Sequence, residues 1–216
     1  MLSKEKNTTT TIEKIAALQF SCTQENLRTA VALVGHIAAR QGSLPILSNV
    51  LLRAEGKTLT VLATNLELAM SYQLRGRVEQ DGAVTANAKL LGDVVQLLPH
   101  DRVDVGVDDA EITLTSRGNT TKVRGMDAVE FPLIPSVDRH QEVVVAAAAL
   151  RDAFGAVAFA VASGSARPEL SGVLVAVDGT SAKVVATDSY RLGEATLPLT
   201  TSTIPKGTQI IVPGRT

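Results

Sequence analysis

The sequence predicts an α+β fold built from two copies of one structural unit. Stretches with the apolar periodicity of helices alternate with runs typical of antiparallel hairpins, and the second half of the chain resembles the first at a constant offset. Of the 216 residues, 45% are hydrophobic but only 3% are aromatic, so we expect an aliphatic core. The same shortage of aromatic residues disfavours a surface on which the bases of a single strand stack.

Charge and cysteine content narrow the class of protein further. The formal net charge is −1, from 21 Lys and Arg against 22 Asp and Glu, which excludes a strongly basic nucleic-acid-binding arm. The single cysteine, Cys22, cannot form an internal disulfide or a thiolate metal cluster. No apolar run reaches the length that a membrane span needs. The sequence therefore predicts a cytoplasmic chain without a membrane partner.

Residues 27–38 form the first clear helical pattern. Thr23 stands where an N-cap residue is expected, and Gly42 is well placed to stop the helix. A second apolar pattern predicts another helix over residues 89–98. The apolar positions of the first pattern are Leu27, Ala30, Val31, Val34, Ile37 and Ala38.

Short apolar runs between and after these helices predict antiparallel strands. Turn residues at 54–57 join two of them into a hairpin. Two prolines within residues 131–135 exclude a continued helix or a central strand there, and predict a linker. We therefore expect a flexible leader over residues 1–17, a first domain over 18–138 and a second over 139–216. The expected strands are residues 46–53, 58–63, 67–78, 82–86, 102–107, 110–116 and 120–124.

An offset of 123 aligns the second half of the chain with the first. Residues 44–67 and 167–190 share nine identities in twenty-four positions without a gap, where chance gives roughly two. Similarity over so long a period indicates a duplicated structural unit. Residues 209–214 match, at an offset of 126, the segment that leads into the helix over 89–98. We therefore expect a truncated second domain, in which Arg215 stands near the start of the next helix.

Ordered motifs occur in both halves of the chain. The first half contains Arg40, then Leu44-Pro45-Ile46-Leu47-Ser48-Asn49-Val50-Leu51-Leu52, Ala63-Thr64-Asn65-Leu66-Glu67 and Glu130-Phe131-Pro132. The second half contains Arg167-Pro168-x-Leu170-x-Gly172-Val173 and Ala186-Thr187-Asp188-x-x-Arg191-Leu192. From Phe20 onward the chain thus resembles the bacterial DNA polymerase III beta subunit, the replication sliding clamp. We expect three departures from that family: a longer leader, one extra residue after Arg40, and the absence of a third domain.

The resemblance implies a DNA clamp fold, in which duplicated domains line a central hole with helices and carry antiparallel sheets outside. It also implies a non-catalytic processivity factor, without a cofactor, that encircles duplex DNA and tethers the replicative polymerase. Contacts between a sliding protein and DNA phosphates have to be weak and independent of base sequence. The residues that the resemblance suggests for DNA binding are Arg28, Arg40, Lys89, Arg151 and Arg215.

A second implied site binds short apolar peptide motifs of polymerases and clamp-loader subunits. Read without the resemblance, Ala186-Thr187-Asp188 is better explained as a simple turn, because Thr64-Asn65 occupies the same place in the first copy. The family closes its ring by head-to-tail pairing into a homodimer, and the candidate residues for that surface are Thr121 and Val123. The candidate residues of the peptide pocket are Leu170, Thr187, Ser189, Tyr190, Arg191 and Leu192.

Catalytic and metal sites have little support in the sequence. The three histidines match no metal-ligand spacing, and His36 is expected to lie partly buried within the first helix. Cys22 has apolar neighbours, which favours a structural thiol. Two other functions stay open: a peptide-binding adaptor without a DNA role, and a small hydrolase that uses Asp188 and Arg191 although no nucleophile is visible.

Overall fold

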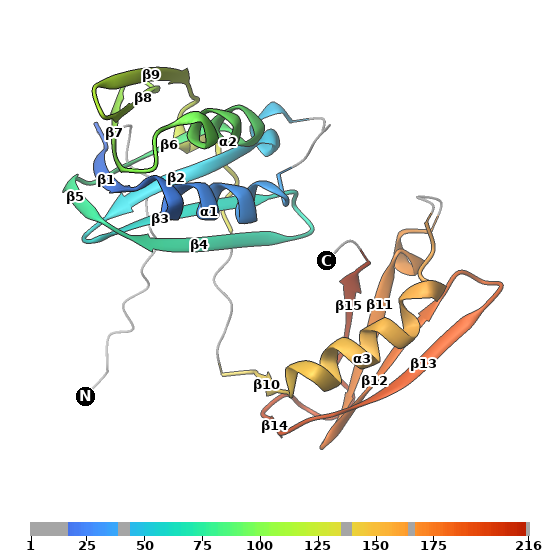
Figure 1. Cartoon of the computed structure of the whole chain (residues 1–216). Helices are drawn as coiled ribbons and strands as arrows, with labels where there is room; N and C mark the ends of the chain where they lie inside the picture. Colours follow the sequence, from blue (N-terminus) through green and yellow to red (C-terminus); the bar gives the residue numbers. More distant parts are fainter. Residues whose placement is uncertain (1–16, 39–43, 135–139, 164–166, 215–216) are drawn as a thin grey trace, which may run out of the picture. The chain divides into compact units, whose positions relative to one another are not determined.

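The computed structural model describes residues 17–38, 44–134, 140–163 and 167–214 (Figure 1). The chain divides into two compact units, Met1–Ile134 (unit 1) and Pro135–Thr216 (unit 2). Nearly all of the predicted leader lies outside the described residues.

The described residues of unit 1 form two antiparallel sheets and two α-helices. The first sheet has the strand order β4 (Ala69–Arg75), β3 (Thr58–Thr64), β2 (Asn49–Glu55), β6 (Gly82–Asn87). The second has the order β5 (Arg77–Gln80), β1 (Gln19–Thr23), β7 (Arg102–Asp108), β8 (Glu111–Ser116), β9 (Asn119–Arg124). The helices are α1 (Gln24–Gly35) and α2 (Ala88–Leu97), and they pack against each other.

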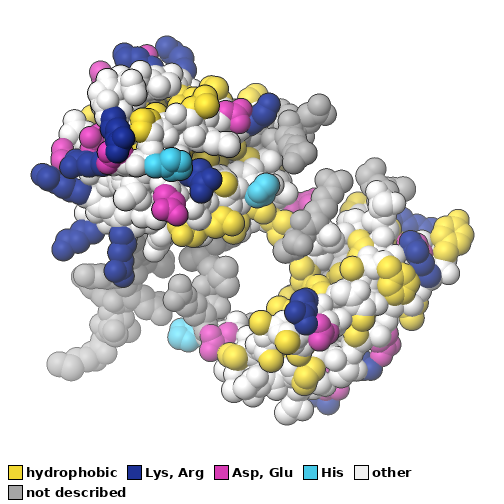
Figure 2. All heavy atoms as spheres, in the orientation of Figure 1, with side chains coloured by type: hydrophobic (Ala, Val, Ile, Leu, Met, Phe, Trp, Pro, Cys, Tyr) yellow, Lys and Arg dark blue, Asp and Glu magenta, His cyan; other side chains and the backbone are white. Residues whose placement is uncertain are grey.

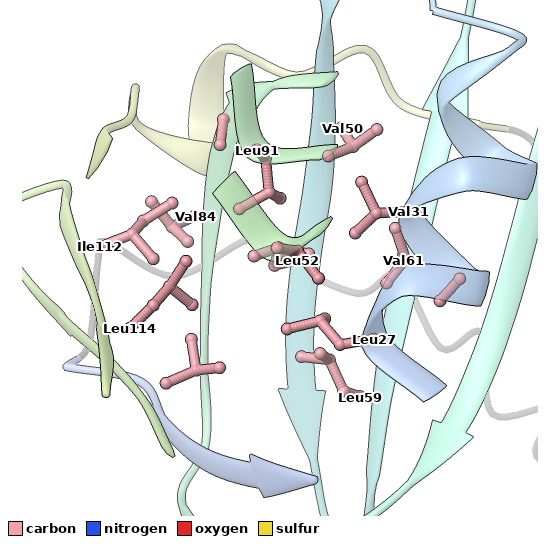
Figure 3. Close-up of a cluster of buried hydrophobic side chains, with 14 of the residues drawn as sticks. Leu27, Val31, Val50, Leu52, Leu59, Val61, Val84, Leu91, Ile112 and Leu114 are labelled. Carbon is pink, nitrogen blue, oxygen red and sulfur yellow. The ribbon is translucent and has the colours of Figure 1, made fainter. Parts of the chain in front are cut away.

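Helix α1 covers the first sheet with the apolar stripe that the sequence predicts. Leu27 and Val31 are buried and point toward Leu59 and Val61 of β3 (Figure 3). Thr23 is the N-cap as predicted, since its hydroxyl accepts a hydrogen bond from the Asn26 N–H (3.4 Å). The helix nevertheless starts three residues before the predicted range and ends at Gly35. The predicted stop at Gly42 lies outside the described residues.

Helix α2 runs antiparallel to α1. Gly35 at the end of α1 lies against Ala88 at the start of α2, while the buried Gln24 amide donates to the Val95 carbonyl near the other end (2.8 Å). The Asn87 side chain caps α2 by accepting from the Leu90 N–H (3.0 Å). The two helices therefore form one layer with both of their apolar stripes facing the core.

Two predicted strands are wrong in part. Residues Pro45–Ser48 form a 3-10 helix, η1, rather than the start of a strand. Pro45 provides no N–H for a sheet, and its carbonyl accepts from the Ser48 hydroxyl (2.7 Å). The predicted strand over 67–78 is broken at Gly76, where a Cβ atom would lie 2.3 Å from the carbonyl oxygen of Ser21. Strand β1 was not among the predicted strands.

The predicted linker begins inside the folded part of unit 1. Phe131 follows the short 3-10 helix η2 (Ala128–Glu130) and is buried. It packs in a small cluster with Ile46, Leu47 and Leu51, separate from the main core. The prolines do end regular structure as expected, but the first residue of this segment is fixed by apolar packing.

Unit 2 repeats the first sheet of unit 1. Its strands are β13 (Leu192–Pro198), β12 (Ser181–Thr187), β11 (Gly172–Asp178) and β15 (Gln209–Pro213), in the same order as β4, β3, β2 and β6. Leu51 pairs with Leu62 in unit 1. Leu174 and Val185, which stand 123 positions after these two residues, pair with each other in unit 2. The predicted duplication is confirmed in both strand order and register. The other elements are β10 (Val143–Val144), β14 (Thr201–Ser202), helix α3 (Ala147–Val157) and the 3-10 helices η3 (Ala158–Ala160) and η4 (Pro168–Leu170).

Helix α3 differs from α1 in the covering of its apolar face. Leu27 of α1 is 1% exposed, whereas its counterpart Leu150 of α3 is 39% exposed. Among the described residues of unit 2, no second helix takes the place that α2 holds beside α1. An apolar groove of about 530 Å³ lies there instead, lined in part by Leu150, Phe154 and Val212.

Candidate peptide and DNA interfaces

Five of the six predicted pocket residues lie in one tight turn between β12 and β13. The Thr187 hydroxyl donates to the Arg191 carbonyl oxygen (2.8 Å) and accepts from the Ser189 N–H (3.1 Å). Asp188 Oδ1 accepts from the N–H groups of Tyr190 and Arg191, each at 3.0 Å. These bonds hold Ser189 at a φ of 78°, in the left-handed region that side chains rarely adopt. The backbone of the site is therefore fixed by the site's own side chains.

The same turn occurs in unit 1 between β3 and β4. The Thr64 hydroxyl donates to the Leu68 carbonyl oxygen (2.7 Å) and accepts from the Leu66 N–H (3.0 Å). Asn65 Oδ1 accepts from the N–H groups of Glu67 (3.0 Å) and Leu68 (2.8 Å). Leu66 has a φ of 73°. The turn is thus a property of the repeated unit, and only its side chains distinguish the two copies.

Leu170, the sixth predicted pocket residue, lies at the end of η4 and is half-buried. The start of that segment contacts the turn, because Arg167 Nη1 donates to the Ser189 hydroxyl (3.2 Å). The turn itself exposes large side chains: Tyr190 is 98% exposed and Leu192 64%. Exposed apolar side chains of the turn therefore lie at one end of the unit 2 sheet, where a polar contact ties the turn to the segment that contains Leu170.

Arg191 is held by two partners. Its Nε donates to Asp188 Oδ2 at 2.9 Å, and its guanidinium carbon lies 5.7 Å from the centre of the Phe159 ring. The Tyr190 and Arg191 N–H groups lower the pKa of the Asp188 carboxyl below its ordinary value of 3.8, and Arg191 adds to the effect. Phe159, on η3, was missed by the sequence reasoning, since no motif or periodicity marks it.

The basic residues predicted to contact DNA lie on helix surfaces where they are described. Arg28 of α1 and Lys89 of α2 are exposed, and the antiparallel packing puts them toward opposite ends of the two-helix layer. Arg151 of α3 is exposed and paired with the neighbouring Asp152 (2.9 Å). Arg40 and Arg215 lie outside the described residues. On the face shown in Figure 2, Lys and Arg side chains are interspersed with acidic ones instead of forming one continuous basic surface.

Strand β9 carries both residues predicted for subunit pairing, and it is the edge strand of the five-stranded sheet. Thr121 is half-buried, but the Val123 side chain is 2% exposed and belongs to the core of unit 1. Thr121 and Val123 are two positions apart and so face the same side of β9, the side on which their partners Leu114 and Ile112 are buried in the core. The prediction that Val123 presents its side chain to a partner is therefore wrong, and what β9 offers is its backbone edge.

Within the described residues, no nucleophile is hydrogen-bonded to the side chains of Asp188 and Arg191, as the hydrolase alternative would need. Asp188 already accepts two backbone N–H groups and the Arg191 side chain. Cys22 is buried, which raises its pKa from 9.0 to about 12, so the thiol is a structural one as predicted. His36 is exposed at the C-cap of α1, contrary to the predicted partial burial within the helix. The described residues contain no group of three His, Cys, Asp or Glu side chains placed to hold a metal ion.

None of the described helices is both long and apolar enough to cross a bilayer.

Comparison with known proteins agrees with this arrangement. The family model of the DNA polymerase III beta subunit N-terminal domain matches residues 18–135, and that of its central domain matches residues 144–216. A beta sliding clamp of Synechococcus elongatus is 33% identical over 178 residues, which cover 81% of this chain and 48% of the relative. The chain spans about half the length of the curated relatives it matches.

Two solved structures illustrate the structural similarity. The DNA polymerase sliding clamp of Bacillus subtilis has a TM-score of 0.86 at 22% identity, with 93% of this chain and 55% of that chain covered, and so supports the fold. A sliding clamp of Pseudomonas aeruginosa bound to griselimycin has a TM-score of 0.79 at 28% identity, with the same coverage of 93% and 55%.

Proposed function

Because this chain belongs to the DNA polymerase III beta subunit family, we propose that it forms part of a sliding clamp that encircles duplex DNA and tethers the replicative polymerase. The observation that carries the proposal is the repeated unit, whose strand order and register recur 123 residues later within a chain that matches two successive domains of this family. Repetition of one helix-and-sheet unit is a simple way to build a ring, because each repeat contributes similar helices to the inner surface.

The mechanism is topological and needs no catalysis. A closed ring cannot leave DNA sideways, so each phosphate contact can be weak while the ring as a whole stays bound. A few exposed cations such as Arg28, Lys89 and Arg151 suit this role, because a dense basic surface would slow sliding. The net charge of −1 is compatible with such weak contact.

Unit 2 supplies the docking surface for partner proteins in this proposal. The turn from Thr187 to Leu192, together with Leu170, offers apolar side chains beside fixed polar groups. A short apolar peptide segment of a polymerase or clamp-loader subunit would dock there. The griselimycin complex of the Pseudomonas aeruginosa clamp makes that compound a suitable probe for this chain.

The ring closes, in the proposal, by head-to-tail pairing of two copies through the β9 edge. Among the described strands, β9 has a neighbour on one side alone, so its outer edge offers backbone N–H and C=O groups that another strand can complete. In this proposal the protein acts in the cytoplasm, where it binds DNA and the polymerase at the same time.

Primer extension on a long template tests this function. The replicative polymerase of the same organism is assayed with and without the intact protein and its loading factor, under a trap that allows only one binding event. We expect products many times longer with the protein present, and no such gain with a Leu170→Ala variant. Product lengths that do not change on addition of the protein would refute the proposed function.

A further inference from the structure

Phe159 lies beside the proposed peptide site with half of its side chain exposed (54%). We propose that Phe159 is a positioning residue of this site. Its ring holds the Arg191 guanidinium beside the turn, so that the guanidinium is already ordered when a peptide docks. The inference rests on the proposed peptide-docking function and adds to it a residue that the sequence motifs do not include.

Unit 1 shows that the turn itself does not need this arrangement. The same hydrogen bonds form there with Asn65 in place of Asp188 and Leu68 in place of Arg191, and neither residue carries a charge. At the offset of 123, the residue that corresponds to Phe159 is His36. The ion pair and the ring therefore add nothing that the repeated fold requires, which leaves a role specific to unit 2.

The local packing brings the ring to Arg191. Gly193, two residues after Arg191, lies under η3, and a Cβ atom there would be 3.0 Å from Val157 Cα and 3.4 Å from Phe159 Cε1. Glycine thus lets η3 approach β13 closely, with Phe159 reaching the turn. Asp188 holds Nε of Arg191 at 2.9 Å, while the ring lies 5.7 Å from the guanidinium carbon.

A guanidinium fixed in this way favours binding of a partner. Arginine loses much side-chain freedom when it binds a ligand, and a group that is already ordered loses less. Its planar fork suits carbonyl and carboxylate oxygens. The fitting partner is a short peptide with an apolar side chain that packs on Leu170 and Leu192 and an oxygen acceptor next to it.

Side-chain NMR of the intact chain tests the positioning directly. The variants are Phe159→Leu, which removes the ring but keeps an apolar side chain, and Phe159→Tyr, which keeps the ring. Phe154→Leu on α3 is the matched control, the same exchange at a phenylalanine of the same unit. We expect Phe159→Leu alone to abolish the ring-current shift of the Arg191 side-chain protons and to increase the mobility of its Nε–H. An Arg191 signal that is the same in Phe159→Leu and wild type would overturn the proposal.

Griselimycin binding to the same proteins tests the consequence. Loss of a partly exposed cation–π contact corresponds to about a two- to fivefold weaker affinity. We expect that loss for Phe159→Leu, recovery in Phe159→Tyr, and no change in Phe154→Leu. If Phe159→Leu matches wild type in affinity, positioning has no part in binding and the proposal is wrong. If instead Leu170→Ala and Arg191→Ala bind as wild type while the NMR signature holds, the peptide-docking function itself fails.

Discussion

Thr64 and Thr187 hold two copies of the same turn with the same pair of hydrogen bonds, although they are 123 residues apart. Each hydroxyl donates to the carbonyl oxygen four residues later, at 2.7 Å and 2.8 Å, and accepts from the N–H two residues later, at 3.0 Å and 3.1 Å. The residue after next is in the left-handed region in both turns. The hydroxyl is therefore part of what defines the repeated unit.

Removing either hydroxyl should destabilise its own unit. Thr64→Val or Thr187→Val keeps the side-chain shape but loses both hydrogen bonds, with an expected cost of about 1 kcal/mol in the free energy of unfolding. Thr→Ser at the same positions retains the hydroxyl and serves as the control. Urea unfolding measures the change, and equal stability of the Val and Ser variants would contradict this role.

The two equivalent leucines of α1 and α3 should respond differently to truncation. Leu27→Ala opens a cavity in a packed core and should cost about 2–5 kcal/mol, because Leu27 is 1% exposed. Leu150 is 39% exposed beside an open groove, so Leu150→Ala should cost about 1 kcal/mol or less. Amide hydrogen exchange, analysed separately for unit 1 and unit 2, measures the loss of unfolding free energy in each variant. A cost for Leu150→Ala as large as that for Leu27→Ala would show that the groove is filled in solution.

The sequence predicts the repeated parts of the fold best. The hairpin of β2 and β3 and its copy in β11 and β12 follow from local patterns that occur twice, so each copy supports the other. The 3-10 helix at Pro45–Ser48 was missed because a short apolar run such as Ile46-Leu47 fits a strand or a buried turn equally well. Strand β1 was missed because its partners β5 and β7 are distant in sequence.

The candidate site could be predicted only in part, for a related reason. The turn from Thr187 to Leu192 is one continuous motif, so five of its pocket residues are read from the sequence together. The contact between Phe159 and Arg191 joins segments 32 positions apart and has no copy in unit 1. Burial of Val123 likewise depends on which face of β9 meets the core, which the register alone decides.

Cys22 should make stability fall at high pH. Burial raises the pKa of its thiol from 9.0 to about 12, so the folded protein keeps a proton that the unfolded chain releases in this interval. The contribution is fully present below pH 9.0 and is lost as the pH rises toward 12. Urea unfolding of wild type and Cys22→Ala across this range measures it. Parallel pH profiles for the two proteins would contradict the raised pKa.

Asp188 should make the stability of the protein fall at low pH, whereas Cys22 does so at high pH. Its pKa is lowered in the folded protein, so its stabilising effect is present above the unfolded value of 3.8 and is lost as the pH falls through the folded pKa. Asp188→Asn should keep the turn, as Asn65 does, but release Arg191. Unfolding between about pH 6 and pH 2 should show the two proteins converging in acid. A constant difference would indicate that the carboxylate charge has no effect.

The exposed helix cations should act through phosphate contacts that salt weakens. Arg28→Ala, Lys89→Ala and Arg151→Ala should each weaken binding to duplex DNA equally for all base sequences. Each should reduce the slope of log affinity against log salt by up to about 1 between about 50 and 200 mM. Arg77→Ala on β5, where Arg77 pairs with Glu79 at 3.3 Å, is the control. Unaltered slopes in the helix variants would exclude these residues from the DNA contact.

The claim that the chain belongs to a ring around DNA is tested most directly by retention on circular and linear DNA. The intact protein is loaded on a nicked plasmid by its loading factor, washed in high salt, and followed before and after the plasmid is cut once. We expect the protein to stay on the closed circle and to leave when the DNA is made linear, since only enclosure resists the wash. Equal retention on both forms, or none on the circle, would contradict the account.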